Sequence, residues 1–279
     1  MPIRARWALR VAGACAALVA LLWLAAFHVG FVERADQTVL LAFYNFTFLY
    51  EQHGHAARFV VSLCDPSRAV YLAAVPVVVA LARRRPYDAC AVFVLLAGAA
   101  LTTLLLKHVL PEPFLGVPSP VPYPRFPSGH STIAMSLVLA LTLVAPARFR
   151  PLIAGLGAVF AAAVGYALLT LGSHYPTDVF GGFLVATTWA LLTAAALFAF
   201  EGHLGRSARS TRRLSLQEVV TPPIAALIAA VLLATIVVLS DPHAVASYVR
   251  GNTAFIVGAA VIAALSTAAA TGVVLSVRR

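Results

Sequence analysis

Apolar stretches about as long as a bilayer is thick recur along the whole chain, and they constrain its fold more than any other feature. A helix needs about 20 mostly apolar residues to cross the roughly 30 Å of hydrocarbon in a bilayer. Only 11% of the 279 residues are charged, whereas a soluble domain has about a quarter. The sequence therefore predicts an all-α, polytopic membrane protein. We expect eight spans, at about residues 9–31, 69–83, 88–107, 130–147, 151–170, 177–200, 221–240 and 252–276.

Three parts of the chain follow from these spans. Residues 1–201 are expected to form a transmembrane core, residues 202–220 a basic cytoplasmic loop, and residues 221–279 a C-terminal pair of transmembrane helices. Residues 32–68 mix aromatic and polar side chains, which is typical of a helix that lies along the headgroups. The first span has a longer apolar run than a cleaved signal peptide, so we expect it to remain as an anchor.

The basic residues indicate how the spans are oriented. The net charge of +10 is spread over short loops, which predicts contact with anionic membrane lipids and not with nucleic acid. With the N-terminus inside, 14 of the 20 Arg and Lys residues fall on the inner face and 6 on the outer face. Because basic loops favour the cytoplasmic side, we predict a cell-membrane protein with both termini in the cytoplasm.

Three groups of polar residues lie at the outer ends of predicted spans. Lys107 ends the third span, Pro127-Ser128-Gly129-His130 begins the fourth, and the run from His174 to Asp178 joins the fifth to the sixth. Ionisable residues are costly near a membrane interior and commonly mark functional sites. Since all three groups lie on one side, they predict a single extracytoplasmic site.

Two histidines and one aspartate in these groups suit phosphoryl transfer. Asp178, four positions after His174, can hold one imidazole nitrogen and leave the other as a nucleophile. His130 can act as the general acid towards the leaving oxygen. These three residues are therefore the predicted catalytic group.

The remaining residues of the predicted site suit phosphate binding. Ser128 and Gly129 offer a hydroxyl and backbone N–H groups at the positive end of a helix, and Lys107 adds a point charge. The Cys and acidic ligands typical of zinc or magnesium sites are missing from these motifs. We therefore expect neither a metal nor another cofactor.

Taken together, the motifs resemble those of the type 2 phosphatidic acid phosphatase (PAP2) family. Its motifs are K-x6-R-P, P-S-G-H and S-R-x5-H-x3-D; here P-S-G-H is intact, H-x3-D is kept, and Lys107 precedes them at a suitable spacing. The resemblance covers about residues 60–200 and implies a six-helix core. It also implies that His174 attacks phosphorus, that Asp178 orients it, and that His130 protonates the leaving group.

Both arginines of the family motifs are missing from their usual places. The first position holds Phe114, followed by Leu115 in place of proline, and the Ser-Arg of the third motif falls at Ala167-Leu168. Loss of a bidentate phosphate ligand weakens binding of the transition state. We predict that Arg125, two residues before the P-S-G-H motif, substitutes as a phosphate ligand. Weaker candidates on the same face are Arg34, Arg58 and Arg68.

Structural interpretations remain open for several of these residues. Ser128 and Asp178 could serve only as helix caps, and Lys107 could be a helix-end residue reaching to the interface. Glu112 is interpreted as a solvated loop acid, with contact to a lipid headgroup as the alternative. A disulfide framework is not expected, and packing is the predicted role of Cys15, Cys64 and Cys90.

The favoured function is hydrolysis of a lipid phosphate or polyprenyl (pyro)phosphate. A phospho-headgroup transferase would use the same histidine chemistry with another acceptor, and a non-catalytic lipid-binding homologue is a further alternative. A transporter is disfavoured because no charged residue lies at mid-span. The expected partners are a lipid phosphate substrate and membrane lipids, with a homo-oligomer as an open option.

Overall fold

The computed structural model describes residues 3–49, 51–113, 121, 125–203, 216–240 and 242–277. In these ranges the protein is all-helical, as the sequence predicts, and contains no strand. The helices are α1 (Ile3–His28), α2 (Gly30–Leu49), α3 (Glu51–Ser62), α4 (Pro66–Ala82), α5 (Pro86–Val109), α6 (Gly129–Val144), α7 (Arg150–Thr170), α8 (Pro176–His203), α9 (Leu216–Ser240), α10 (Pro242–Gly251) and α11 (Thr253–Ser276).

Each of the eight predicted spans coincides with one of these helices. Among the described residues, six helices are long and apolar enough to cross a bilayer: α1, α5, α7, α8, α9 and α11. Helix α4 has 17 residues and reaches the length of a span only together with α3, which is bent by 55° relative to it. Helix α6 has 16 residues, fewer than a perpendicular span needs.

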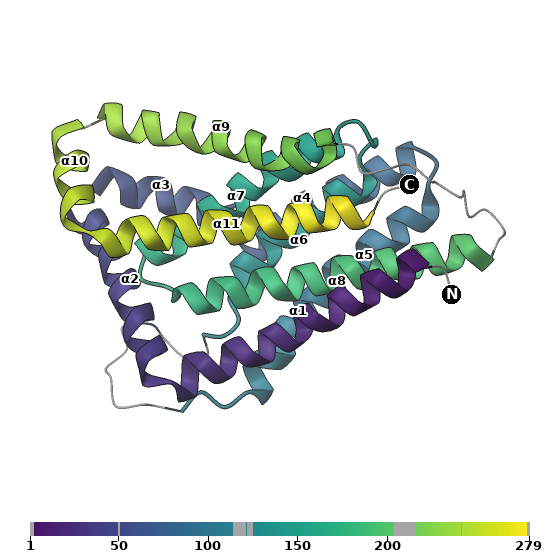
Figure 1. The fold of residues 1–279 in the computed structure, drawn as a ribbon, viewed down its shortest axis with the longest axis horizontal. Helices are drawn as coiled ribbons and strands as arrows, with labels where there is room; N and C mark the ends of the chain where they lie inside the picture. Colours follow the sequence, from purple (N-terminus) through teal and green to yellow (C-terminus); the bar gives the residue numbers. More distant parts are fainter. Residues whose placement is uncertain are drawn as a thin grey trace.

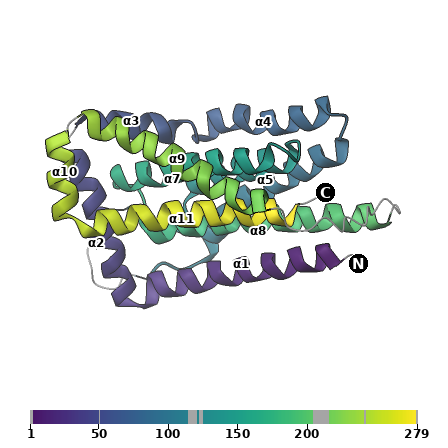
Figure 2. The same cartoon turned by 45° about the horizontal axis from the view of Figure 1, so that its top comes forward.

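The segment predicted as one interfacial helix forms two helices with different directions. Helix α2 lies across one end of the bundle, beside α10, whereas α3 runs beside the long helices and leads into α4 (Figures 1 and 2). The expectation of a single helix over residues 32–68 was therefore wrong. In α2 the acidic side chains of Glu33 and Asp36 are buried. Helix α3 instead packs against α7.

Helix α6 is the centre of the bundle. It packs against α4, α5, α7, α8 and α11, and most of its side chains are buried. The P-S-G-H motif lies at the start of α6, where Phe126 and Ser128 are completely buried.

Two arginines bind backbone carbonyls of several chain segments at the end of the bundle where α6 ends. Arg150 donates to the carbonyls of Leu143, Ala145 and Val277 at 3.3, 3.1 and 2.7 Å, and Arg83 donates to Val144. Cations stabilise the carbonyl ends of helices. These contacts bring the α4–α5 link, the end of α6 and the end of α11 together, at the end where both termini lie (Figure 1).

The C-terminal helices pack directly on the core. Helices α9 and α11 contact α7, and the Tyr166 hydroxyl donates to the Ala259 carbonyl at 2.6 Å. An aromatic cluster joins α2, α7, α10 and α11; its members are Phe43, Phe46, Tyr166, Tyr248 and Phe255. Most of the predicted basic loop, residues 204–215, lies outside the described residues.

Candidate active site

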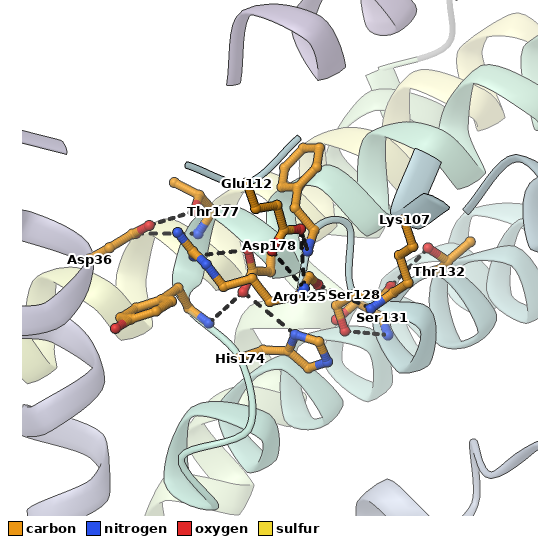
Figure 3. A network of polar contacts seen from close by, with 12 residues as sticks. Asp36, Lys107, Glu112, Arg125, Ser128, Ser131, Thr132, His174, Thr177 and Asp178 are labelled. Atoms are coloured by element: carbon orange, nitrogen blue, oxygen red, sulfur yellow. Dashed lines mark hydrogen bonds and ion pairs between the residues drawn. The ribbon is translucent and has the colours of Figure 1, made fainter. Parts of the chain in front are cut away.

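The three polar groups predicted from the sequence converge at the end of the bundle opposite the termini (Figure 3). Lys107 lies in the last turn of α5, Ser128 is the N-cap of α6, and Asp178 lies in the first turn of α8. His174 belongs to the five-residue link between α7 and α8. That link turns at Gly172, whose φ of +65° is one that glycine adopts without strain.

His174 has one ring nitrogen against a buried carboxylate. Its Nδ1 lies 3.5 Å from Asp178 Oδ2, which is an ion-pair distance, and forms no hydrogen bond with the described residues. The same Oδ2 accepts the Tyr175 backbone N–H at 2.9 Å. The Asp178 side chain is completely buried and that of His174 is 12% exposed. Nε2 of His174 therefore stays clear of the carboxylate.

Arg125 binds the other oxygen of the same carboxylate. Its Nη1 lies 3.2 Å from Asp178 Oδ1, and the side chain is only 3% exposed. The guanidinium carbon lies 4.3 Å from the ring centre of Phe27 and 4.4 Å from that of Tyr175. A planar cation stacked between two rings and bound to a carboxylate is held in one orientation. Arg125 is thus part of the site, and its predicted contact with phosphate remains a prediction.

Glu112 organises the backbone that leads into the P-S-G-H motif. Its carboxylate accepts the N–H of Arg125 at 3.0 and 3.1 Å and the N–H of Phe126 at 2.9 Å. The interpretation of Glu112 as a solvated loop acid was therefore wrong. Sequence alone did not reveal this role, because the acid and its partners are 13 and 14 positions apart.

The start of α6 combines a capped helix end with open space. Ser128 Oγ accepts the Ser131 N–H at 3.4 Å, while the Ser128 N–H donates to the Asp178 carbonyl at 2.9 Å. A Cβ atom built on Gly129 would meet no atom within 4 Å. Lys107 Nζ donates to the Arg125 carbonyl at 3.3 Å. The helix N-terminus therefore has open space beside Gly129, an arrangement that favours an anion.

Two glycines on α8 allow the P-S-G-H segment to approach closely. A Cβ on Gly182 would lie 2.7 Å from the Ser128 carbonyl oxygen, and one on Gly181 would lie 2.6 Å from the Phe126 ring. Both distances are too short for any larger residue. The pair was not singled out in the sequence, although it follows Asp178 by only three and four positions.

Two further carboxylates complete the polar network. Asp65 Oδ1, from the turn between α3 and α4, lies 3.2 Å from Nε2 of His130. Asp36 on α2 accepts the Thr177 backbone N–H at 3.3 Å and also the Thr177 hydroxyl. Burial raises the pKa of Asp36 to about 7. The only local signal for either residue is an acid within a largely aromatic and apolar segment.

Comparison with known proteins identifies the family. The model of the PAP2 superfamily matches residues 11–202. The chain belongs to the PAP2 superfamily. The resemblance inferred from the motifs is thereby confirmed, and it extends beyond residues 60–200 to include α1, α2 and α3.

A solved PAP2 structure has the same fold. It is described as the first transmembrane PAP2 type phosphatidylglycerolphosphate phosphatase from Bacillus subtilis, with a TM-score of 0.52 and 20% identity. The match covers 71% of this chain and 98% of that one. No curated protein sequence matches the chain. The C-terminal helices α9, α10 and α11 of this PAP2 protein lie beyond the residues that the family model matches.

The places of the missing family arginines differ in what surrounds them. Ala167 and Leu168 are buried in α7, at 5% and 1% exposure, within an apolar environment. Phe114 and Leu115 lie outside the described residues. Among the described residues, no group of three or more His, Cys, Asp or Glu side chains is placed to hold a metal ion.

Proposed function

We propose that this PAP2 protein is a lipid phosphatase, which hydrolyses a lipid phosphate or polyprenyl (pyro)phosphate through a phosphohistidine intermediate. The observation that carries the proposal is the placement of His174, with Nδ1 at the Asp178 carboxylate and Nε2 clear of it. A carboxylate that fixes one imidazole nitrogen makes the other an oriented nucleophile.

In the first step, the Nε2 lone pair of His174 attacks phosphorus. A P–N bond forms while the P–O bond to the leaving group breaks, and His130 gives its proton to the departing oxygen, which belongs to a lipid alcohol for a monoester and to a lipid phosphate for a pyrophosphate. In the second step, water attacks the phosphohistidine. His130 takes a proton from this water as the P–N bond breaks, which releases phosphate and restores both histidines.

The phosphoryl oxygens need positive charge and N–H donors throughout. Lys107 and the N–H groups at the start of α6, including that of Gly129, border the space beside His174 and would supply them. The buried Ser128 helps by holding this helix end in place. Arg125 is the remaining candidate ligand, although its guanidinium also binds Asp178.

The proposed site lies on the extracytoplasmic face of the cell membrane. The support is the distribution of basic residues: the end with Arg83 and Arg150 also holds both termini, and the site occupies the other end. Since basic segments favour the cytoplasm, the substrate would be a lipid of the outer leaflet.

A phospho-headgroup transferase is the second candidate, and one observation favours it. Arg125 is engaged with Asp178, and apolar side chains occupy the place of another family arginine at Ala167-Leu168. A site with few available cations suits a phosphodiester, which carries one negative charge, better than a doubly charged monoester. In that case an acceptor alcohol would replace water in the second step.

Release of inorganic phosphate by the purified protein tests the proposal. The panel contains phosphatidic acid, phosphatidylglycerol phosphate, undecaprenyl phosphate and undecaprenyl pyrophosphate in detergent. We expect release from at least one substrate, and a loss of about a thousandfold or more in His174→Ala. The matched control is His108→Ala, because His108 is exposed at the same end and contacts its own helix at the Leu104 carbonyl. Equal activity of His174→Ala and the wild type would overturn the mechanism, and new phosphodiester without free phosphate would establish the transferase.

A further inference from the structure

Asp65 occupies a helix-capping position but does not use its side chain as a cap. It directly precedes Pro66, and its backbone carbonyl accepts the N–H groups of Arg68 and Ala69 at 3.0 and 2.8 Å. Aspartate is among the best N-cap residues, yet this side chain makes no capping hydrogen bond. The carboxylate is thus oriented by something other than the helix.

A neighbouring cation does not explain the orientation either. The Arg68 guanidinium, three positions along the chain, donates to the Ser62 hydroxyl. Within the described part of the chain, the side-chain contact of Asp65 is His130, with 3.2 Å between Oδ1 and Nε2. The two side chains are 45% and 31% exposed, so the pair lies where the site opens.

The site therefore holds two carboxylate–imidazole pairs in different environments. Asp178 is buried and shares its charge between His174 and the Arg125 guanidinium. Asp65 lies closer to solvent and has no such guanidinium in contact. A carboxylate already neutralised by arginine stabilises an imidazolium less than an unshared carboxylate does. The Asp65 carboxylate, 3.2 Å from Nε2, therefore favours the protonated form of His130, which is the form that an acid requires.

We infer that Asp65 is a positioning residue that holds His130 as the general acid of the reaction. The inference rests on the proposed function and assigns an orientation to the ring. Because Nε2–H donates to Asp65, the proton passed to the leaving oxygen is the one on Nδ1. The carboxylate also offsets the positive charge of Lys107, which lies within electrostatic range of His130. Without it, His130 would less often carry the proton when the P–O bond breaks.

The dependence of the rate on the leaving group separates this role from a structural one. A general acid matters for an alkoxide, which is a poor leaving group, and little for p-nitrophenolate, which departs without a proton. The value of kcat/KM reports the steps up to departure of the leaving group. We expect Asp65→Asn to lower kcat/KM about tenfold or more for the best lipid monoester of the panel. For p-nitrophenyl phosphate, the change should stay within about twofold.

Three further variants are compared with Asp65→Asn. Asparagine is as good an N-cap as aspartate, so Asp65→Asn keeps the start of α4. Asp65→Glu restores a carboxylate and should recover part of the lost activity towards the lipid. The matched control is Asp88→Asn, which removes an acid paired with Arg85 at 3.5 Å at the opposite end and should leave the ratio of the two substrates unchanged. His130→Ala should show the same selectivity as Asp65→Asn, with larger losses.

The outcomes distinguish this inference from the proposed function. Equal losses for both substrates in Asp65→Asn, or no loss for the lipid, would overturn the role of Asp65 while the phosphatase proposal stands. A wild-type protein that releases phosphate from no substrate would overturn the phosphatase proposal, and this inference would fall with it.

Discussion

At the scale of single residues, the buried ion pair of Arg125 and Asp178 makes the stability of the protein sensitive to the loss of either charge. Both side chains are buried, and their charges contact each other at 3.2 Å. A buried ion pair contributes little by itself, but removing one partner leaves the other as an uncompensated charge. Two aromatic rings and the Glu112 contacts to the adjacent backbone hold the arginine in place.

Removal of the guanidinium alone should therefore destabilise the protein. We expect Arg125→Met to lower the free energy of unfolding by about 3–5 kcal/mol, measured by denaturant titration in detergent. The double variant Arg125→Met with Asp178→Asn should recover much of this loss because no charge remains buried, yet it should stay inactive. Arg250→Met is the control, since Arg250 is exposed and its side chain donates to the Ala246 carbonyl of its own helix. A double variant no more stable than the single one would contradict the coupling.

At the scale of helices, the site depends on how closely α8 approaches the start of α6 and how α2 is tied to α8. Gly181 and Gly182 permit the first contact, and Asp36 makes the second through Thr177. Both contacts act on the first turns of α6 and α8, which carry Ser128 and Asp178. A shift of either helix would move the proposed catalytic groups relative to one another.

A substitution that adds one methyl group between α6 and α8 tests the contact between these helices. Gly182→Ala would place a Cβ 2.7 Å from the Ser128 carbonyl oxygen and 2.9 Å from the Thr132 nitrogen. Overpacking of this kind destabilises by about 1–3 kcal/mol, and phosphate release should fall with it. Gly272→Ala is the matched control, because Gly272 lies within α11, near its C-terminal end, and its Cβ would meet nothing within 4 Å. There we expect a gain of up to about 1 kcal/mol.

The contact between α2 and α8 predicts a dependence of stability on pH. Burial raises the pKa of Asp36 from 3.8 to about 7, with the charge of Asp178 adding to the rise while Thr177 and Arg125 oppose it. Between these values the folded state keeps a proton that the unfolded state has lost. The contribution of Asp36 to stability is therefore largest below pH 3.8 and decreases as pH rises to about 7, by about 1.4 kcal/mol per pH unit at most.

Thermal unfolding in detergent across this pH range measures the effect. Asp36→Asn stays neutral at every pH, so its unfolding midpoint should decline less between pH 4 and pH 7 than that of the wild type. Asp88→Asn should follow the wild-type pH dependence. Parallel curves for the wild type and Asp36→Asn would show that Asp36 does not titrate in this range.

At the scale of the whole molecule, the two ends of the bundle differ in charge and in role. One end holds both termini and the arginine contacts to helix carbonyls, and the other holds the site, α2 and α10 (Figure 1). Helices α9 and α11 pack against α7, and α11 also contacts α2, α6 and α8. The C-terminal pair therefore widens the membrane-embedded body and leaves the site's residues to the PAP2 core.

Thiol labelling of intact cells tests the orientation. On a background in which the native cysteines are replaced by alanine, Gly251→Cys lies at the last residue of α10, at the site's end, and Arg84→Cys lies between α4 and α5 at the other end. Both positions are exposed. A membrane-impermeant maleimide should label Gly251→Cys in intact cells and Arg84→Cys only after lysis. The reverse pattern would place the site in the cytoplasm.

The amino-acid sequence by itself determined the features that depend on local composition and spacing. Each apolar run specifies a helix, because a chain in hydrocarbon must satisfy its backbone hydrogen bonds internally. The spacing of His174 and Asp178 likewise places both side chains at one helix start. Only the tertiary structure decided which residues from distant segments complete the site. Asp36, Asp65 and Glu112 reach their partners across 141, 65 and 13 positions, and these contacts depend on how closely whole helices pack, which no local periodicity encodes.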